Sequence, residues 1–301
     1  MTLIFVLYAL IALTFVIAKS ALFYAKPIFL IGIRMVLAGA ILLGYLKAFK
    51  KNSLKIDQED KYKFLKVALY HIYLSFILEF WALQYLSSSK TNIIYSITPF
   101  IAAFIAYYFY QEKLNIFKKT GMFLGILAII PVLIAQYNPS EGASLLRFST
   151  AECVMLIAVF CGAYAWFLIK DLMNKGYSLV LINGFAMAIG GVAALITSLI
   201  FEFLIPTFIY NHEVVLVSNY FKFFLWISAL ILTSNIIVYN LYGFLLRKYS
   251  ITFLTLAGFL SPVFGAILGY FLLGEPITWH YLASLGLITL ALYIFNVQER
   301  L

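Results

Sequence analysis

Long apolar runs alternate with short polar connections along the whole chain. A helix needs about 20 residues to cross the hydrocarbon core of a bilayer, and ten runs are that long: 3–23, 27–47, 64–86, 91–111, 116–136, 151–170, 179–202, 221–246, 252–273 and 278–297. Their apolar positions are continuous and do not alternate, which disfavours a β-barrel. The pattern therefore predicts an all-α integral membrane protein with ten transmembrane helices.

The composition agrees with this pattern. Hydrophobic residues make up 64% of the chain and charged residues only 11%, whereas soluble proteins carry about 25% charged residues. So little polar surface cannot cover a water-soluble globule, which excludes a soluble enzyme and a disordered chain. Cys153 and Cys161 lie in one apolar run and predict neither a disulfide framework nor a metal site.

The basic residues predict the topology, because they favour the cytoplasmic side of a membrane. With the N-terminus inside, fifteen Lys and Arg fall in inside segments, five fall in outside segments, and Arg34 lies within a helix. We therefore expect a protein of the inner cell membrane with both termini in the cytoplasm. The first run lacks a basic leader and a cleavage site, so we expect it to be retained. The net charge of +9 then reflects topology and contact with lipid headgroups, and no nucleic-acid partner is expected.

Two stretches of the chain match each other at an offset of 163 residues. Pro99 aligns with Pro262 and Glu112 with Glu275, and small residues lie between the members of each pair. A weaker match at offset 151 aligns Lys19 with Lys170. The repeats predicted on this basis are 1–138 and 150–301. Because each holds five spans, an odd number, the second must be inverted relative to the first, as is typical of secondary transporters.

The segment LTFVIAKSALFYAKPIFLIGIRMVLAGAILL resembles the first two helices of EamA-type members of the drug/metabolite transporter superfamily. That family places a lysine at the end of helix 1 and an arginine early in helix 2, here Lys19 and Arg34, and it shares the repeated Pro–Glu pattern. Thr14 and Phe15 depart from the Trp-Gly pair that is common there. The stretch LEFWALQYLSSSKTNIIYSITPF more faintly resembles S-adenosylmethionine carriers of intracellular bacteria. The resemblance implies a secondary transporter of small organic solutes that does not hydrolyse ATP.

Arg34 and Glu79 are ionisable residues inside predicted spans, which is costly and calls for a reason. Each lies seven residues from the outer end of its helix, or about 10 Å deep. We therefore predict an ion pair or a shared polar network between them. The pair either only fixes helices 2 and 3, or leaves Glu79 facing a cavity where it binds a proton or a cationic group of the substrate.

Two further helices carry polar faces. His71, Ser75 and Glu79 recur every four residues on helix 3, so they share a face that should point inward. Helix 8 is the counterpart of helix 3 and carries Ser228, Asn235, Tyr239 and Tyr242 at helical spacing. These residues either bind substrate or hydrogen-bond between helices. His71 is either a proton relay or a packing residue.

Helices 4 and 9 each carry a proline near an aromatic residue. A proline in a spanning helix frees a backbone carbonyl and kinks the helix, so Pro99 and Pro262 are candidate hinges. Trp81, Tyr164 and Trp166 are possible aromatic walls for a cation or a ring. The predicted substrate-binding residues are His71, Ser75, Glu79, Tyr95, Asn235, Tyr239, Tyr242 and Phe259, and the predicted structural or coupling residues are Lys19, Arg34, Pro99 and Pro262.

These features predict a secondary active transporter of a small metabolite, amino-acid-like or S-adenosylmethionine-like, working by alternating access. A proton or a counter-substrate is the expected coupled species, and no cofactor or metal is expected. The alternatives are a membrane scaffold or receptor and, less favoured, an intramembrane enzyme, since the sequence has no HExxH, GxSxG or P-loop motif. Gly121 and Gly125 form a GxxxG motif that serves either a homodimer or packing within a monomer.

Overall fold

The structure, a computed structural model, describes residues 2–86, 91, 94–95, 97–111, 115–136, 149–205, 216–273 and 279–297. These residues are mostly helical and contain no strand; an isolated antiparallel bridge joins Ala25 to Val217. Six helical segments among them are long and apolar enough to cross a membrane. The expected class, a helical multi-pass membrane protein, is thus confirmed, while the count of ten spans stays a prediction.

The chain forms two compact units. Unit 1 comprises Met1–Leu13, Leu86–Leu156 and Leu245–Leu301, and unit 2 comprises Thr14–Tyr85 and Ile157–Phe244. Each unit is assembled from both halves of the sequence. Three helices, α1 (Thr2–Leu22), α8 (Thr150–Asn174) and α12 (Tyr239–Leu246), contribute residues to both.

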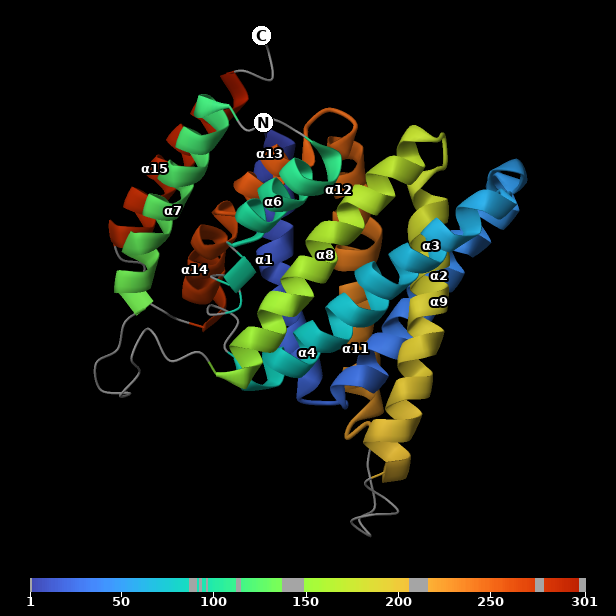
Figure 1. The fold of residues 1–301 in the computed structure, drawn as a ribbon. Coiled ribbons are helices and arrows are strands. Elements are labelled where there is room, and N and C mark those ends of the chain that lie inside the picture. Colours follow the sequence, from blue (N-terminus) through green and yellow to red (C-terminus); the bar gives the residue numbers. More distant parts are fainter. Residues whose placement is uncertain are drawn as a thin grey trace. The chain divides into compact units, whose positions relative to one another are not determined.

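Unit 2 is built from long helices (Figure 1). Besides parts of α1, α8 and α12, it contains α2 (Pro27–Phe49), η1 (Lys51–Leu54), η2 (Gln58–Asp60), α3 (Lys61–Val67), η3 (Ala68–Leu74), α4 (Ser75–Tyr85), α9 (Leu179–Ser198), η5 (Leu199–Leu204), α11 (Tyr220–Leu230) and η6 (Ile231–Val238). Three of these elements, η3, η5 and η6, are single π-helical stretches within longer helices. Such stretches often occur at functional sites.

The most extensive helix contact in unit 2 joins α2 to α9. Glycines bring the two backbones together, as small residues do in membrane helix pairs: a Cβ at Gly39 would lie 2.6 Å from the backbone nitrogen of Ala188. Residue numbers rise along α2 as they fall along α9, so the helices are antiparallel. The contacts are Gly32 with Leu195, Val36 with Gly191, Gly39 with Ala188, and Leu43 with Gly184.

This helix pair relates the two halves of the chain. An offset of 152 residues aligns Gly32 with Gly184 and Gly39 with Gly191. Adding 152 to the α2 residue and subtracting 152 from the α9 residue turns the contact of Gly32 with Leu195 into that of Leu43 with Gly184. It likewise turns the contact of Val36 with Gly191 into that of Gly39 with Ala188. The packing is therefore symmetric under exchange of the two helices with reversal of direction.

Unit 1 contains α6 (Thr98–Tyr110), α7 (Ile116–Gln136), α13 (Ile251–Ala257), α14 (Leu260–Leu273) and α15 (Trp279–Val297). Its most extensive contact joins α7 to α15, which lie side by side in Figure 1. These helices are also counterparts, because Ile116 and Trp279 are 163 residues apart. Gly125 on α7 packs against the ring of Phe259, which explains this half of the GxxxG motif by packing within the unit.

The two predicted hinge prolines lie in first helical turns. Pro99 is in the first turn of α6, and Pro262 is the third residue of α14. The ninth predicted helix, 252–273, is interrupted between α13 and α14, at Gly258 and Phe259. Proline has no N–H to donate to the carbonyl four residues earlier, and for Pro262 that carbonyl belongs to Gly258. Glu112 and Glu275, the other residues of the repeated pattern, lie outside the described residues.

Candidate functional site

Arg34 is the centre of a buried polar network in unit 2. It lies on α2 with 1% of its surface exposed. Its Nε donates a hydrogen bond to Oδ1 of Asn235 at 2.8 Å, and its Nη2 donates to Oγ of Ser234 at 2.6 Å. The guanidinium also faces the rings of Phe76 and Phe80, at 5.1 and 5.8 Å. The arginine of helix 2 is thus bonded directly to the π-helical segment η6.

Glu79 lies near this network. It is on α4, 7% exposed, and interacts electrostatically with Arg34 and with Tyr239. The structure therefore brings Arg34, Asn235 and Glu79 into one buried region of unit 2. Ser234, which the sequence reading missed, joins them; its position directly before Asn235 was the available signal.

His71 belongs to an aromatic cluster formed with Trp166, Tyr239 and Tyr242. The imidazole lies edge-on to Trp166 and to Tyr239, with ring centroids 4.9 Å apart in both cases. Trp166 stacks on Tyr242 at 4.1 Å. His71 is 3% exposed, and its Nε2 has no hydrogen-bond partner within the described part of the chain.

Ser75 and Lys19 make ties between helices. The Ser75 hydroxyl donates to the carbonyl of Ala158 at 3.1 Å, which fastens α4 to α8. The Lys19 ammonium donates to the carbonyls of Leu83 and Gln84. A cation at the C-terminal carbonyls of a helix stabilises them, so Lys19 caps the end of α4.

One expectation for the eighth predicted helix, 221–246, was wrong. Ser228 was predicted to share a face with Asn235, yet Ser228 is exposed while Asn235 is fully buried. The π-helical segment η6 begins between them, at Ile231. Its i→i+5 hydrogen bonds change the angular spacing of residues, so positions seven apart no longer share a face.

Glu202 is a buried carboxylate that the sequence reading missed. Its two carboxylate oxygens accept hydrogen bonds from the backbone N–H groups of Ile28 and Phe29, both at 2.8 Å. Ser198 also donates its hydroxyl to this carboxylate at 2.7 Å. A carboxylate at a helix N-terminus satisfies unpaired N–H groups and complements the helix dipole. Glu202 therefore anchors the start of α2.

The remaining predicted residues belong to unit 1. The hydroxyl of Thr98 donates to the carbonyl of Tyr95 at the entry to α6. Phe259 is buried, and the centroid of its ring lies 6.3 Å from that of Phe100. Tyr95, Phe259, Pro99 and Pro262 thus flank the helix starts of unit 1.

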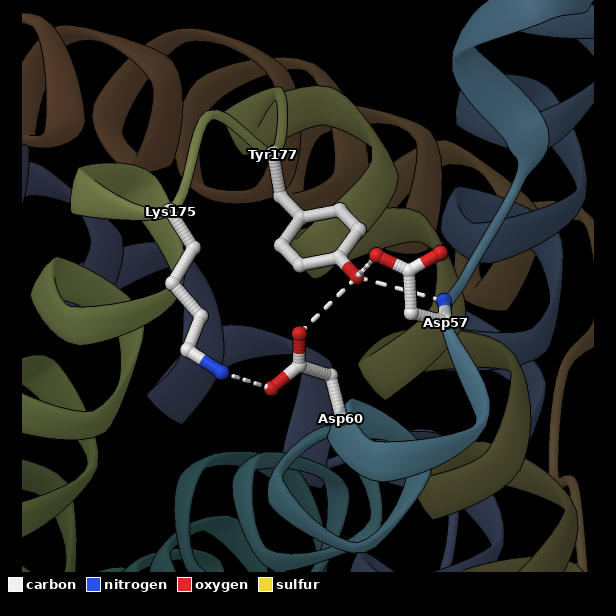
Figure 2. A network of polar contacts seen from close by, with 4 residues as sticks. All are labelled: Asp57, Asp60, Lys175 and Tyr177. Atoms are coloured by element: carbon white, nitrogen blue, oxygen red, sulfur yellow. Dashed lines mark hydrogen bonds and ion pairs between the residues drawn. The ribbon is translucent and has the colours of Figure 1, made fainter.

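A second polar network joins two loops of unit 2 (Figure 2). Lys175 pairs with Asp60, and the Tyr177 hydroxyl donates to Asp57 at 3.1 Å and to Asp60 at 3.0 Å. The hydrogen bond to Asp60 raises the pKa of the Lys175 ammonium. Because the Lys175 side chain is 45% exposed, this network fastens the α2–α3 and α8–α9 loops without forming a closed site. The described residues include no cluster of three or more His, Cys, Asp or Glu suited to a metal ion.

The comparisons with known proteins agree with this architecture. The model of the EamA-like transporter family matches residues 1–134 and 149–297. The S-adenosylmethionine/S-adenosylhomocysteine transporter of Chlamydia muridarum is 33% identical over 288 residues, covering 95% of this chain and 88% of that protein. Its namesake in Chlamydia trachomatis serovar L2 is also 33% identical, over 95% of this chain and 85% of that protein.

A solved crystal structure has the same fold, with a TM-score of 0.71 and 15% identity over 99% of this chain and 96% of that one. The family and the relatives are transporters, which points away from an enzyme. The chain therefore belongs to the EamA-like transporter family and is a multi-pass membrane transporter of a small metabolite.

Proposed function

We propose that this protein exchanges S-adenosylmethionine for S-adenosylhomocysteine across the inner cell membrane. The observation that carries the proposal is the 33% identity to the Chlamydia transporters across 95% of the chain. Both compounds join an amino-acid group, which carries an ammonium and a carboxylate, to a purine nucleoside. S-adenosylmethionine has an additional positive charge at sulfur.

The buried groups of unit 2 suit such a substrate. Glu79 offers a carboxylate to a cationic group, and Arg34 and Glu79 together balance the two charges of an amino acid. The aromatic cluster of His71, Trp166, Tyr239 and Tyr242 offers ring faces for stacking and for a cation. In this proposal Glu79 binds the substrate directly. Arg34 is held in place by Ser234 and Asn235 and contributes a fixed positive charge to the site.

Alternating access follows from ten spans in two inverted repeats, the arrangement that we propose for the full chain. The symmetric, antiparallel packing of α2 against α9 supports it, because helices related by inversion must run in opposite directions. The match of the family model to two successive stretches supports the same division. We place both termini in the cytoplasm, on the distribution of basic residues.

Counterflow into proteoliposomes tests the proposal. Vesicles loaded with S-adenosylhomocysteine should accumulate labelled S-adenosylmethionine faster than empty vesicles. Protein-free vesicles and vesicles with an amino acid inside are the controls. Uptake that is independent of the internal compound would contradict exchange, and the absence of any uptake would contradict S-adenosylmethionine as the substrate.

A further inference from the structure

We propose that unit 2 contains a subsite for the aminopurine ring of the substrate, formed by Asn183, His71 and the aromatic residues beside them. This inference rests on the proposed function, and it assigns the nucleobase to a position beside the Arg34 network. It begins from Asn183, a residue of α9 to which the sequence reading gave no role.

Asn183 is fully buried, with none of its surface exposed. Neither its Nδ2 nor its Oδ1 has a hydrogen-bond partner among the residues that the structure describes. Burying an amide without partners is unfavourable. An amide retained under those conditions, with a donor and an acceptor both unused, is suited to a ligand that supplies the partners.

The neighbours of α9 locate this amide. One turn before it, Leu179 packs against Gly243, where an added Cβ would lie 2.0 Å from the leucine side chain. One turn after it, the sulfur of Met187 accepts from Nδ2 of Asn235 at 3.5 Å. Residues four apart share a helix face, so Asn183 faces the same helix as these two residues. Halfway between Gly243 and Asn235 on that helix lies Tyr239.

Tyr239 is the member of the aromatic cluster that contacts both His71 and Trp166, at 4.9 and 5.8 Å between ring centroids. His71 contributes the second unpartnered polar atom, Nε2. The helix register thus sets Asn183 level with Tyr239, and neither its amide nor Nε2 of His71, on a different helix, has a hydrogen-bond partner among the described residues. This combination of stacking faces with unused donors and acceptors is characteristic of a recognition site for a heteroaromatic ring.

The chemistry of adenine fits these groups. Its 6-amino group donates beside a ring nitrogen that accepts, and a side-chain amide of asparagine pairs with both atoms at once. The aromatic rings supply faces on which a base can stack, and Nε2 of His71 adds one further polar contact. Because S-adenosylmethionine and S-adenosylhomocysteine have the same purine, this subsite would bind both, independently of the charge at sulfur.

Inhibition of S-adenosylmethionine counterflow by two competitors tests the subsite. One is S-adenosylhomocysteine, and the other is its analogue in which hydrogen replaces the 6-amino group. The wild-type protein should bind the analogue at least about tenfold more weakly, since a site built for a donor rejects a ligand that lacks it. Asn183→Leu should weaken the binding of S-adenosylhomocysteine and bring the ratio of the two inhibition constants to about one.

Asn240→Leu is the matched control, because the Asn240 amide already donates to the carbonyl of Ile236 in its own helix, at 2.7 Å. It should keep the wild-type ratio. Asn183→Leu should also raise the melting temperature of the ligand-free protein, since it removes a buried amide that has no partner in the described part of the chain. If that variant does not fold, Asn183→Ser provides the same measurement of the ratio.

Retention of the wild-type ratio in the Asn183 variants, with transport intact, would overturn the subsite and leave the proposed function standing. A wild-type protein that transports neither compound would overturn both.

Discussion

The π-helical segments η3 and η6 lie at equivalent positions of the two halves, yet their side chains differ in kind. An offset of 163 residues aligns Ala68–Leu74 with the start of η6 at Ile231, and it places His71 opposite Ser234. Ser234 and its neighbour Asn235 both accept hydrogen bonds from Arg34. The Nε2 atom of His71 has no such partner within the described residues.

The difference indicates a division of roles between these two π-helical segments. In η6 the polar groups are paired with a charge of the protein, so they stabilise the fold. In η3 a polar atom beside aromatic rings has no partner among the residues that the structure describes, which is unfavourable for stability and favourable for a ligand. Glu79 and Tyr242, also 163 residues apart, lie about two turns further along these helices and differ in the same way, a carboxylate in one and a phenol in the other.

The largest expected effect comes from breaking the η6 side of the comparison. Asn235→Leu removes the acceptor of the buried Arg34 Nε and should lower stability by about 1.5–3 kcal/mol, the range for a hydrogen bond to a charged group. Thermal unfolding in detergent measures the change. Asn240→Leu, on the same helix, is the control and should change stability far less; equal melting of Asn235→Leu and wild type would contradict the structural role.

Removal of the charge at Glu79 should abolish or uncouple transport. Glu79→Gln keeps the shape of the side chain and removes the carboxylate that we assign to a cationic group, so we expect a loss of at least about tenfold, or 1.4 kcal/mol, in transport. Initial rates of uptake into proteoliposomes at several pH values measure it. Wild-type rates with an unchanged pH profile would reject a central role for Glu79.

His71→Phe sharpens the contrast from the η3 side. The phenyl ring of the variant keeps the packing against Trp166 and Tyr239, and the substitution removes the Nε2 atom that has no partner among the described residues. We expect stability to be equal to or above that of wild type, and affinity for S-adenosylhomocysteine to fall by about three- to tenfold, which corresponds to the loss of one hydrogen bond. Ligand-dependent thermal shifts give both quantities, and a marked loss of stability with unchanged affinity would assign His71 to packing.

The smallest effect is expected from the pair of positions that did not diverge. Pro99 and Pro262 keep the same residue and both lie in first helical turns, so we expect Pro99→Ala and Pro262→Ala to act alike. Each should reduce the turnover by about two- to fivefold, less than 1 kcal/mol, and leave the affinity nearly unchanged. The kinetics of uptake separate turnover from affinity. Equal loss of affinity in both variants would favour substrate contact instead.

The helices themselves could be predicted from the sequence with good accuracy. The run 27–47 corresponds to α2 at Pro27–Phe49, and the run 116–136 coincides with α7 at Ile116–Gln136. Membrane helices are predictable in this way because the thickness of the hydrocarbon core imposes a length on each apolar run. The family could be predicted for a similar reason, since the order and spacing of Lys19, Arg34 and the repeated prolines are properties of the linear chain.

The partners of the buried polar groups were decided only by the tertiary structure. Arg34 was expected to share a network with Glu79, but its direct hydrogen bonds go to Ser234 and Asn235, about 200 positions away. The π-helical segments have no periodic signature in the sequence, and one of them, η6, begins between Ser228 and Asn235, which face different ways. Burial and pairing depend on the rotation and packing of neighbouring helices, and a pattern along one helix does not determine them.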